Sequence, residues 1–118
     1  MKIAIPVNDT EGPESEVSPH FGRAAGFILF DSESGETETI ANTSEHTGGS
    51  GKPPELLEDA GVDVVLCANL GRRAVAMFKQ LGIGVCTGAS GTARETFEAW
   101  KNDELDEATE EGACRGHH

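Results

Sequence analysis

The segment around His20 carries residue types that could bind a metal. In Ser18-Pro19-His20-Phe21-Gly22-Arg23-Ala24, a histidine, a cation and a flexible glycine lie together where a long polar loop ends. An imidazole is a borderline ligand that suits iron, and the guanidinium of Arg23 can pair with a carboxylate or with an anionic metal cluster. The alternative is a structural loop in which His20 bonds only the backbone. The residue types alone leave both interpretations open.

The C-terminus offers a second set of candidate ligands. Cys114, His117 and His118 include a Cys-x-x-His spacing, which can close on one metal ion if the chain folds back. A passive terminus left by cloning is the alternative, although two histidines are too few for a usual affinity tag. His46, which precedes a glycine-rich run at residues 48–51, is a further candidate ligand.

Cys67 and Cys86 are second-rank metal ligands, because each ends an apolar run that is expected to form a strand. Free cysteine is among the most buried residue types, so packing in the core is the favoured interpretation. Both sulfurs could still approach one site if the two strands are neighbours. The chain has three cysteines, an odd number that favours a reducing compartment over a disulfide framework, and we expect a cytoplasmic protein.

Charge and motifs argue against several classes of function. The chain carries 21 acidic and 9 basic residues, and its net charge of −12 repels nucleic acids and anionic membranes. An ordinary acidic surface and adaptation to high salt are both compatible with that charge. Residues 46–52 lack the first glycine and the Ser or Thr of a phosphate-binding loop, and no Gly-x-Ser-x-Gly motif occurs. No apolar run approaches the ~20 residues that span a membrane.

The pattern of apolar runs and turn residues predicts an α/β domain over residues 1–102 and an acidic, mobile tail over residues 103–118. The domain would contain a mixed sheet of about five strands with helices on its faces. The predicted strands cover residues 2–7, 26–31, 36–40, 62–68 and 83–86, and the predicted helices begin near residues 53, 72 and 92. Thr92 and Glu95 match a capping box at the start of the last helix.

Sheets of this kind bind ligands beyond the carboxyl ends of their parallel strands. If the first strand runs parallel to the last two, residues 8–22, 69–73 and 87–92 meet at that edge. The latter two segments lead into helix N-termini, whose free amides attract anions. The residues expected to contact a bound cofactor there are Gly71, Arg72, Ser90 and Gly91.

These motifs, in this order, resemble those of a known family. His20-Phe21-Gly22-Arg23-Ala24, followed by Phe27 and Asp31, resembles the signature of the dinitrogenase iron–molybdenum cofactor biosynthesis family, the NifX-like domain. The resemblance continues through residues 46–51, 61–65, 69–74 and 81–85, and so covers nearly the whole chain. It implies a ribonuclease-H-like α/β fold in a single three-layer domain.

The resemblance implies a carrier and not an enzyme. Members bind or shuttle iron–sulfur or iron–molybdenum cofactor precursors, so the implied partners are metallocluster donor and acceptor proteins, with this chain a monomer or weak homodimer. The implied cofactor contacts are His20, Phe21, Gly22 and Arg23, with His20, His46, Cys114, His117 and His118 as metal ligands. Relatives often have a cysteine in the glycine-rich loop, where this chain offers Ser50 and Lys52. That difference shifts the expected ligands to the histidines and the tail.

Two other functions stay open. One is a ribonuclease-H-like enzyme that cleaves phosphodiesters, although two-metal cleavage needs carboxylates on the strands and residues 2–7 contain none. The other is a cluster-free interaction domain for a metallocluster protein.

Overall fold

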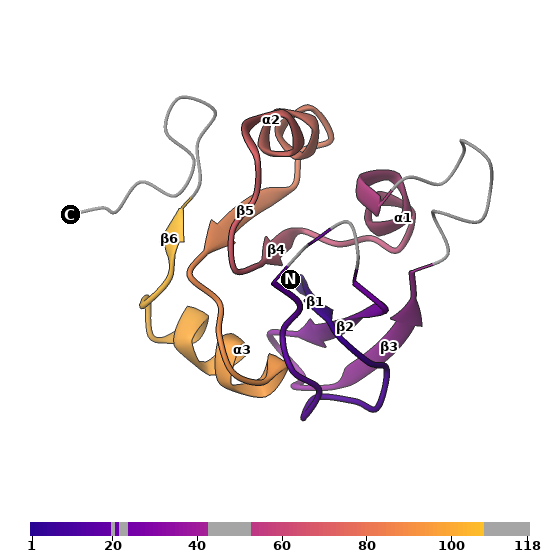
Figure 1. Cartoon of the computed structure of the whole chain (residues 1–118), viewed down its shortest axis with the longest axis vertical. Coiled ribbons are helices and arrows are strands. Elements are labelled where there is room, and N and C mark those ends of the chain that lie inside the picture. Colours follow the sequence, from indigo (N-terminus) through magenta and orange to yellow (C-terminus); the bar gives the residue numbers. More distant parts are fainter. Residues whose placement is uncertain (20, 22–23, 43–52, 108–118) are drawn as a thin grey trace.

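The fold is built on one mixed sheet with helices packed on both of its faces (Figure 1). The computed structural model describes residues 1–19, 21, 24–42 and 53–107. The strands of that part are β1 (Lys2–Val7), β2 (Gly26–Asp31), β3 (Thr37–Ala41), β4 (Val64–Leu66), β5 (Gly84–Thr87) and β6 (Asp106–Glu107). Its helices are α1 (Pro53–Asp59), α2 (Arg72–Gln80) and α3 (Ala93–Lys101). The strand order is β3-β2-β1-β4-β5-β6.

Strand β1 lies near the centre of the sheet. It pairs antiparallel with β2 and parallel with β4, and β4 pairs parallel with β5. The carboxyl ends of β1, β4 and β5 therefore lie at one edge of the sheet, which is the condition under which the sequence analysis expected residues 8–22, 69–73 and 87–92 to meet there. Strands β2 and β3 form the predicted hairpin, whose turn holds Gly35 at φ +78°, a conformation that glycine adopts without steric cost.

A short sixth strand extends the predicted mixed sheet of about five strands. Strand β6 pairs antiparallel with β5, with Thr87 opposite Asp106 and Cys86 opposite Glu107. The pairing covers the edge of β5 that would otherwise be open, and Leu105 packs against the apolar cluster beside α3. Residues 106–107, which fall within the segment predicted as a tail, therefore belong to the sheet. Residues 108–118 lie outside the described part.

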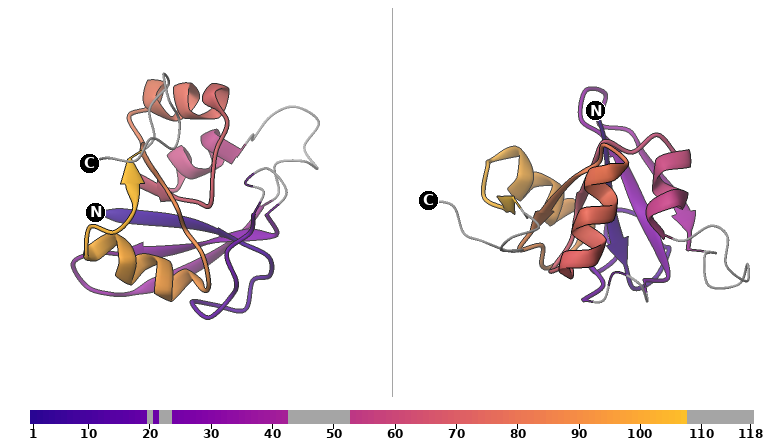
Figure 2. Two further views of the ribbon diagram at one scale, coloured as in Figure 1. Left: turned by 60° about the vertical axis from the view of Figure 1, so that its left-hand side comes forward. Right: turned by 90° about the horizontal axis from the view of Figure 1, so that it is seen from above.

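Each face of the sheet has its own apolar core, because successive side chains of a strand point to opposite faces. Phe27 points to the face that α1 and α2 cover, where Phe78 of α2 joins the same cluster. Phe30 points to the other face and stacks on Phe97 of α3, with the ring centroids 4.4 Å apart. The result is three layers, with the sheet between α3 and the pair α1 and α2 (Figure 2).

The helices begin and end at the residues that the sequence indicated. The capping box is present: the Thr92 hydroxyl oxygen accepts from the Glu95 amide, and the Glu95 carboxylate accepts from the Thr92 amide. Gly61 and Gly82 follow α1 and α2 with φ of +81° and +78°. None of the described helices is long and apolar enough to cross a membrane.

Candidate functional site

The three segments that follow β1, β4 and β5 meet at one edge, as predicted. The amide of Ser18 donates to the carbonyl of Pro6 at 2.9 Å, and the amide of Val17 donates to the carbonyl of Gly91 at 2.9 Å. The amide of Ala89 donates to the carbonyl of Cys67 at 3.1 Å. These long-range backbone bonds fix the segments relative to one another, and we call this region the carboxyl edge (residues 8–19, 67–71 and 88–92).

Phe21 anchors the loop that carries the predicted ligand His20. Its ring is 8% exposed and contacts Phe78 of α2 edge-on at 5.4 Å between centroids and Phe27 of β2 at 5.5 Å. Leu70, which precedes α2, belongs to the same buried cluster. The immediate neighbour of His20 is therefore fixed on the α1 and α2 face, against Phe78 of α2. His20, Gly22 and Arg23 themselves lie outside the described residues.

Asn42 ties the second histidine-bearing loop to the first. Its side-chain amide donates to the carbonyl of Ala24 at 2.9 Å, and its backbone amide donates to the carbonyl of Ala25 at 3.0 Å. The side chain is 8% exposed, so these bonds are shielded from water. The sequence analysis missed this positioning residue, although a lone Asn directly after an edge strand is a signal for such a turn. Residues 43–52, with His46, lie outside the described part.

Helix α2 begins without a side-chain cap. Its N-cap residue is Gly71, at φ −70° and ψ 158°, and no side chain accepts from the first turn. Among the described residues, no acceptor bonds the amides of Arg72, Arg73 and Ala74. A Cβ placed on Gly71 would meet no atom of the described residues within 4 Å, so that part of the chain leaves space at this helix end for an incoming group. Both guanidinium groups are exposed beside it.

Helix α3 begins very differently, and here the sequence prediction was wrong about the amides. The amide of Ala93 donates to the carbonyl of Ser15, and that of Arg94 donates to the carbonyl of Pro13, both at 2.9 Å. The Glu95 amide is taken by the capping threonine at 3.1 Å. The N-terminal amides of α3 are therefore occupied by protein acceptors. The capping box was visible in the sequence, but the loop carbonyls come from about 80 residues away.

Ser90 and Gly91 stay predicted cofactor contacts. The N-terminal amides of α3 cannot contribute to binding beside them, because protein acceptors already occupy these amides. The carbonyl of Ser90 accepts from the Thr96 hydroxyl at 3.1 Å, and the carbonyl of Gly91 accepts from Val17. Gly91 has φ +76°, and a Cβ there would run into the Glu95 carboxylate. Both residues thus hold the α3 side of the carboxyl edge together. Gly71 and Arg72 lie at the start of α2, on the other side of the carboxyl edge.

Cys67 and Cys86 lie on neighbouring strands, but their sulfurs do not converge. Cys67 is 1% exposed in the cluster beneath α1 and α2. Cys86 packs against the α3 cluster and lines a hollow of about 230 Å³ together with Trp100 and Leu105. The amide of Cys67 donates to the carbonyl of Cys86 at 3.0 Å, which confirms that the two strands are adjacent. Because the side chains point to opposite faces, the two thiols cannot share one metal ion.

The first-rank metal ligands predicted from the sequence fall on parts of the chain beyond the described residues. Those candidates are His20, His46, Cys114, His117 and His118. Within residues 1–19, 21, 24–42 and 53–107, no three His, Cys, Asp or Glu side chains come close enough to hold one metal ion. The described part of the carboxyl edge therefore offers positive charge and backbone donors, and metal ligands would have to come from the loops beside it.

Comparison with known proteins agrees with this architecture. A high-resolution structure of the apo form of the orange protein from Desulfovibrio gigas has a TM-score of 0.81 and 26% identity, covering 91% of this chain and 92% of that chain. An NMR structure of a Thermotoga protein proposed as a NifB protein has a TM-score of 0.76 and 34% identity, covering 90% and 91% of the two chains. An uncharacterised protein of Methanocaldococcus jannaschii is 37% identical over 90 residues, 72% of each chain.

The family itself follows from the sequence match. The family model described as dinitrogenase iron-molybdenum cofactor matches residues 1–103, which is nearly all of the α/β domain through the end of α3. The match ends before β6, so it covers the first five strands but not β6 or the residues after it. This chain belongs to the dinitrogenase iron–molybdenum cofactor family.

Proposed function

We propose that this protein binds and carries an iron–sulfur or iron–molybdenum cofactor precursor during metallocluster assembly, between a donor and an acceptor protein, without catalysing a reaction itself. The family and the likeness to the apo orange protein support a role in metallocluster binding or biosynthesis. The observation that carries the proposal is the difference between two helix ends at the carboxyl edge. The start of α2 is open and flanked by Arg72 and Arg73, whereas the start of α3 is closed by Ser15 and Pro13.

An anionic cargo suits the start of α2 for three physical reasons. A helix N-terminus carries a partial positive charge, and its first amides point outward as donors. Arginine adds charge-assisted hydrogen bonds to anions. The described cations elsewhere already have contacts: Arg94 bonds Glu14 at 2.8 Å, Lys2 bonds the carbonyl of Ala60, and Lys101 lies over the Phe97 ring. In a chain of net charge −12, this pair of guanidinium groups is therefore the favoured place for an anion.

Residue roles follow from that placement. His20 is the proposed primary iron ligand, because the packing of Phe21 holds its loop on the same face as α2. Arg23, together with Gly22 in the same loop, is the proposed charge partner of Arg72 at the cargo. His46 and the tail ligands Cys114, His117 and His118 would complete or gate the site. Cys67 and Cys86 are assigned to the two cores.

The fold assignment to the ribonuclease-H-like class is part of the same proposal. It is supported by the mixed sheet, in which β1, β4 and β5 run parallel and β2 runs antiparallel to its neighbours β1 and β3. The short strand β6 adds a second antiparallel pairing, with β5. Such a fold also supports enzymes, so fold does not decide between a carrier and a nuclease. The open, cationic helix end favours the carrier, since it can hold an anion without any reaction.

Anaerobic reconstitution with iron and sulfide tests the proposal directly. We expect a visible charge-transfer band and an electron paramagnetic resonance signal after reduction, with iron and sulfide retained through gel filtration. His20→Ala should lose most of the bound iron, and Arg72→Ala with Arg73→Ala should release it roughly tenfold faster, equivalent to ~1.4 kcal/mol. Arg94→Ala is the matched control, because Arg94 is an exposed residue of α3 and pairs with Glu14 of the loop after β1.

The outcome against the proposal is equally clear. A wild-type chain that retains no iron and sulfide, or retains them equally well after His20→Ala, would contradict a carrier function at this edge. Metal-dependent cleavage of a phosphodiester substrate would instead support the nuclease.

A further inference from the structure

Strand β3 forms an edge of the sheet and leaves its outer side open. It is the last strand beyond β2, and no described residue belongs to a strand on its other side (Figure 1). Four of its five residues are exposed, and Ile40 is half-buried against the cluster beneath α1 and α2. The strand at the opposite side of the sheet, β6, has only two residues. In the described part of the chain, β3 is therefore the longer of the two edge strands.

Alternate residues of β3 turn their backbone groups away from β2. In an antiparallel pair, residues that exchange backbone bonds with the partner strand alternate with residues that do not. The Asp31 amide donates to the carbonyl of Glu36 at 2.9 Å, and at the other end the Asn42 amide donates to the carbonyl of Ala25 at 3.0 Å. The even-numbered residues of β3 therefore bond β2. The open-edge residues, whose amides and carbonyls point outward, are Thr37, Thr39 and Ala41.

An acidic hollow lies beside this open edge. It has a volume of about 230 Å³, and its lining includes Asp31, Glu36 and Glu38 together with one cationic residue, Lys2. Lys2 already donates to the carbonyl of Ala60 at 3.1 Å. Glu36 and Glu38 form no ion pair with a described residue. Within the described part of the chain, two carboxylates beside the open edge thus have no counter-charge.

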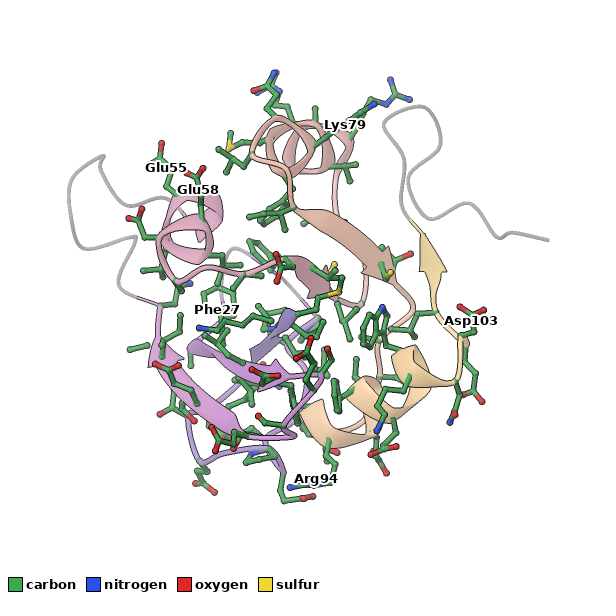
Figure 3. All side chains as sticks on the ribbon, turned by 180° about the vertical axis from the view of Figure 1, so that it is seen from behind. Phe27, Glu55, Glu58, Lys79, Arg94 and Asp103 are labelled. Carbon is green, nitrogen blue, oxygen red and sulfur yellow. The ribbon has the colours of Figure 1, made fainter. Side chains whose placement is uncertain are left out.

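The acidic character of this face continues beyond β3. Glu38 lies opposite Leu29, whose side chain belongs to the cluster beneath α1 and α2, so Glu38 projects toward the same face. Helix α1 carries Glu55, Glu58 and Asp59 and no base. Figure 3 shows Glu55 and Glu58 pointing away from the sheet. A chain that approaches the open edge on this face therefore meets a negative potential, which favours cations.

A second copy of this chain fits the open edge poorly. Two β3 strands paired in one continuous sheet would keep their faces aligned, so Glu36 and Glu38 of both copies would lie on the same face. Like charges on neighbouring strands destabilise a sheet, and each chain also carries a net charge of −12. Charges of this kind prevent edge strands from pairing with themselves. A strand with cations at the matching positions replaces the repulsion with attraction.

We propose that β3 binds an extended, basic segment of a partner protein, which adds to the sheet as an antiparallel strand. The backbone of that segment would bond the open-edge amides and carbonyls, and its lysine or arginine side chains would lie opposite Glu36 and Glu38. In this mode of recognition the main-chain bonds supply affinity, and the alternate side chains supply specificity. The small side chains of Thr37, Thr39 and Ala41, on the other face, leave room for β-branched neighbours.

The direction of β3 fixes where such a partner would stand. Ala41 pairs with Gly26, and Gly26 pairs with Val7 at the carboxyl end of β1. The end of β3 therefore lies at the carboxyl edge, and an antiparallel segment would begin there. A docked partner would thus stand beside the edge at which the cargo is proposed to bind. This last consequence rests on the proposed function, whereas the strand addition does not.

Hydrogen exchange measured by NMR on the full chain, with a synthetic peptide as the probe, tests the strand addition. The peptide is capped at both ends and has lysine opposite Glu36 and Glu38, valine opposite Ile40, and threonine at the positions between. With the peptide at about ten times its Kd, the open-edge amides should exchange about tenfold more slowly. The amides of Glu38 and Ile40 are an internal control, because they face β2 and should change little.

Matched variants separate strand addition from simple charge attraction. N-methylation of the peptide amides that face β3 should abolish binding, whereas N-methylation of the alternate amides should not. Glu36→Gln with Glu38→Gln should weaken binding severalfold. Glu98→Gln with Glu104→Gln removes the same charge at exposed positions in and after α3, and should leave binding unchanged. Thr39→Pro should abolish binding but keep the fold, because the Thr39 amide does not bond β2.

Three outcomes would overturn the proposal. Equal binding of the peptide N-methylated at the amides that face β3, or equal binding by a folded Thr39→Pro variant, would reduce the contact to diffuse charge attraction. Absence of protection at millimolar peptide would remove the docking. Protection that appears without peptide and grows with protein concentration would assign the edge to a second copy. These measurements involve no iron, so failed docking with successful reconstitution would leave the carrier function standing, and the reverse would leave the docking.

Discussion

The backbone amide of Ala93 donates to the carbonyl oxygen of Ser15 at 2.9 Å, and this bond joins the start of α3 to the loop after β1. The amide of the next residue, Arg94, donates to Pro13 in the same loop, whose residue Glu14 also pairs with the Arg94 guanidinium at 2.8 Å. The loop therefore acts as a cap for α3. No described residue caps α2 in this way. At the carboxyl edge, the N-terminus of α3 is therefore closed by a loop, whereas that of α2 is open.

The capping loop should depend on the hydroxyl of Ser15. That hydroxyl donates to Asp9 at 2.6 Å and accepts from the amides of Glu11 and Gly12 at 3.1 and 3.2 Å, and the residue is 3% exposed. Ser15→Ala removes the acceptor of the buried Gly12 amide, whereas the Glu11 amide keeps its bond to Asp9, and should lower the unfolding free energy by about 1–3 kcal/mol. Urea unfolding followed by circular dichroism measures the change.

Ser34→Ala is the matched control, because Ser34 is exposed in the β2–β3 turn, and it should change the unfolding free energy by less than about 0.5 kcal/mol. Equal effects of the two substitutions would show that the hydroxyl of Ser15 does not hold the loop.

Much of this architecture could be read from the sequence because local signals agree with the fold. The glycines at 35, 61 and 82 occupy left-handed positions next to the elements that they were expected to end. The family resemblance is confirmed by the match over residues 1–103. The parallel pairing of β4 and β5 follows the prediction, and the parallel pairing of β1 with β4 meets the condition on which the location of the carboxyl edge depended.

The features that the sequence did not reveal depend on long-range contacts. Strand β6 has only two residues, both acidic, and no periodicity marks so short a strand. The occupation of the α3 amides by Ser15 and Pro13 depends on how a loop folds against a helix far along the chain. The side chains of Cys67 and Cys86 point to opposite faces of the sheet because of the register between β4 and β5. A shift of one residue in that register would place them on the same face.

Asp103, two residues after the end of α3, has a left-handed backbone conformation that glycine should adopt at a lower energetic cost. It has φ +65°, and its amide donates to the carbonyl of Trp100 while the Glu104 amide donates to that of Ala99, which is the Schellman arrangement. Asp103→Gly removes the steric cost of that conformation and a negative charge at a helix C-terminus, so the unfolding free energy should rise by up to about 1 kcal/mol. Thermal unfolding measures the change.

Asp59→Gly is the control for Asp103→Gly, since Asp59 is the last residue of α1 and exposed. Glycine there should destabilise, because it adds backbone freedom to the unfolded chain without relieving strain. A loss of stability at both positions would rule out strain relief at Asp103.

The Asp31 carboxylate should link the β2–β3 hairpin to pH. It accepts from the backbone amides of Glu33 at 2.8 Å and Ser34 at 3.1 Å, and these bonds hold the pKa of Asp31 below its usual value of 3.8. A lowered pKa means that the stabilisation is complete above the unfolded value and is lost as pH falls through the folded value. The carboxyl carbon shift of Asp31 in an NMR titration should therefore move at lower pH than in a reference peptide; a midpoint at or above the peptide value would contradict the turn bonds.

The net charge predicts that salt stabilises the fold. Repulsion among surface carboxylates at a net charge of −12 is screened over a Debye length of ~10 Å at 0.1 M and ~3 Å at 1 M salt. The melting temperature should rise with potassium chloride over that range. Glu36→Gln with Glu38→Gln, two exposed positions at β3, should raise the melting temperature at low salt and flatten the dependence. A melting temperature that falls with salt in the wild-type chain would remove adaptation to high salt as an interpretation.

Truncation after Gly112 separates the metal ligands of the tail from its acidic residues. The shortened chain loses Cys114, His117 and His118 but keeps β6, Glu110 and Glu111, so the melting temperature of the metal-free protein should hardly change. Release of a reconstituted cluster should become faster, because a second anchoring point is gone. Thiols and imidazoles must lose protons to bind a metal, so in the full chain the tail contribution should fade as pH drops through about 6.5. Equal release rates for the two chains at pH 6 and pH 8 would make the three tail residues a passive terminus, whereas a difference confined to pH 8 would assign them to the cargo.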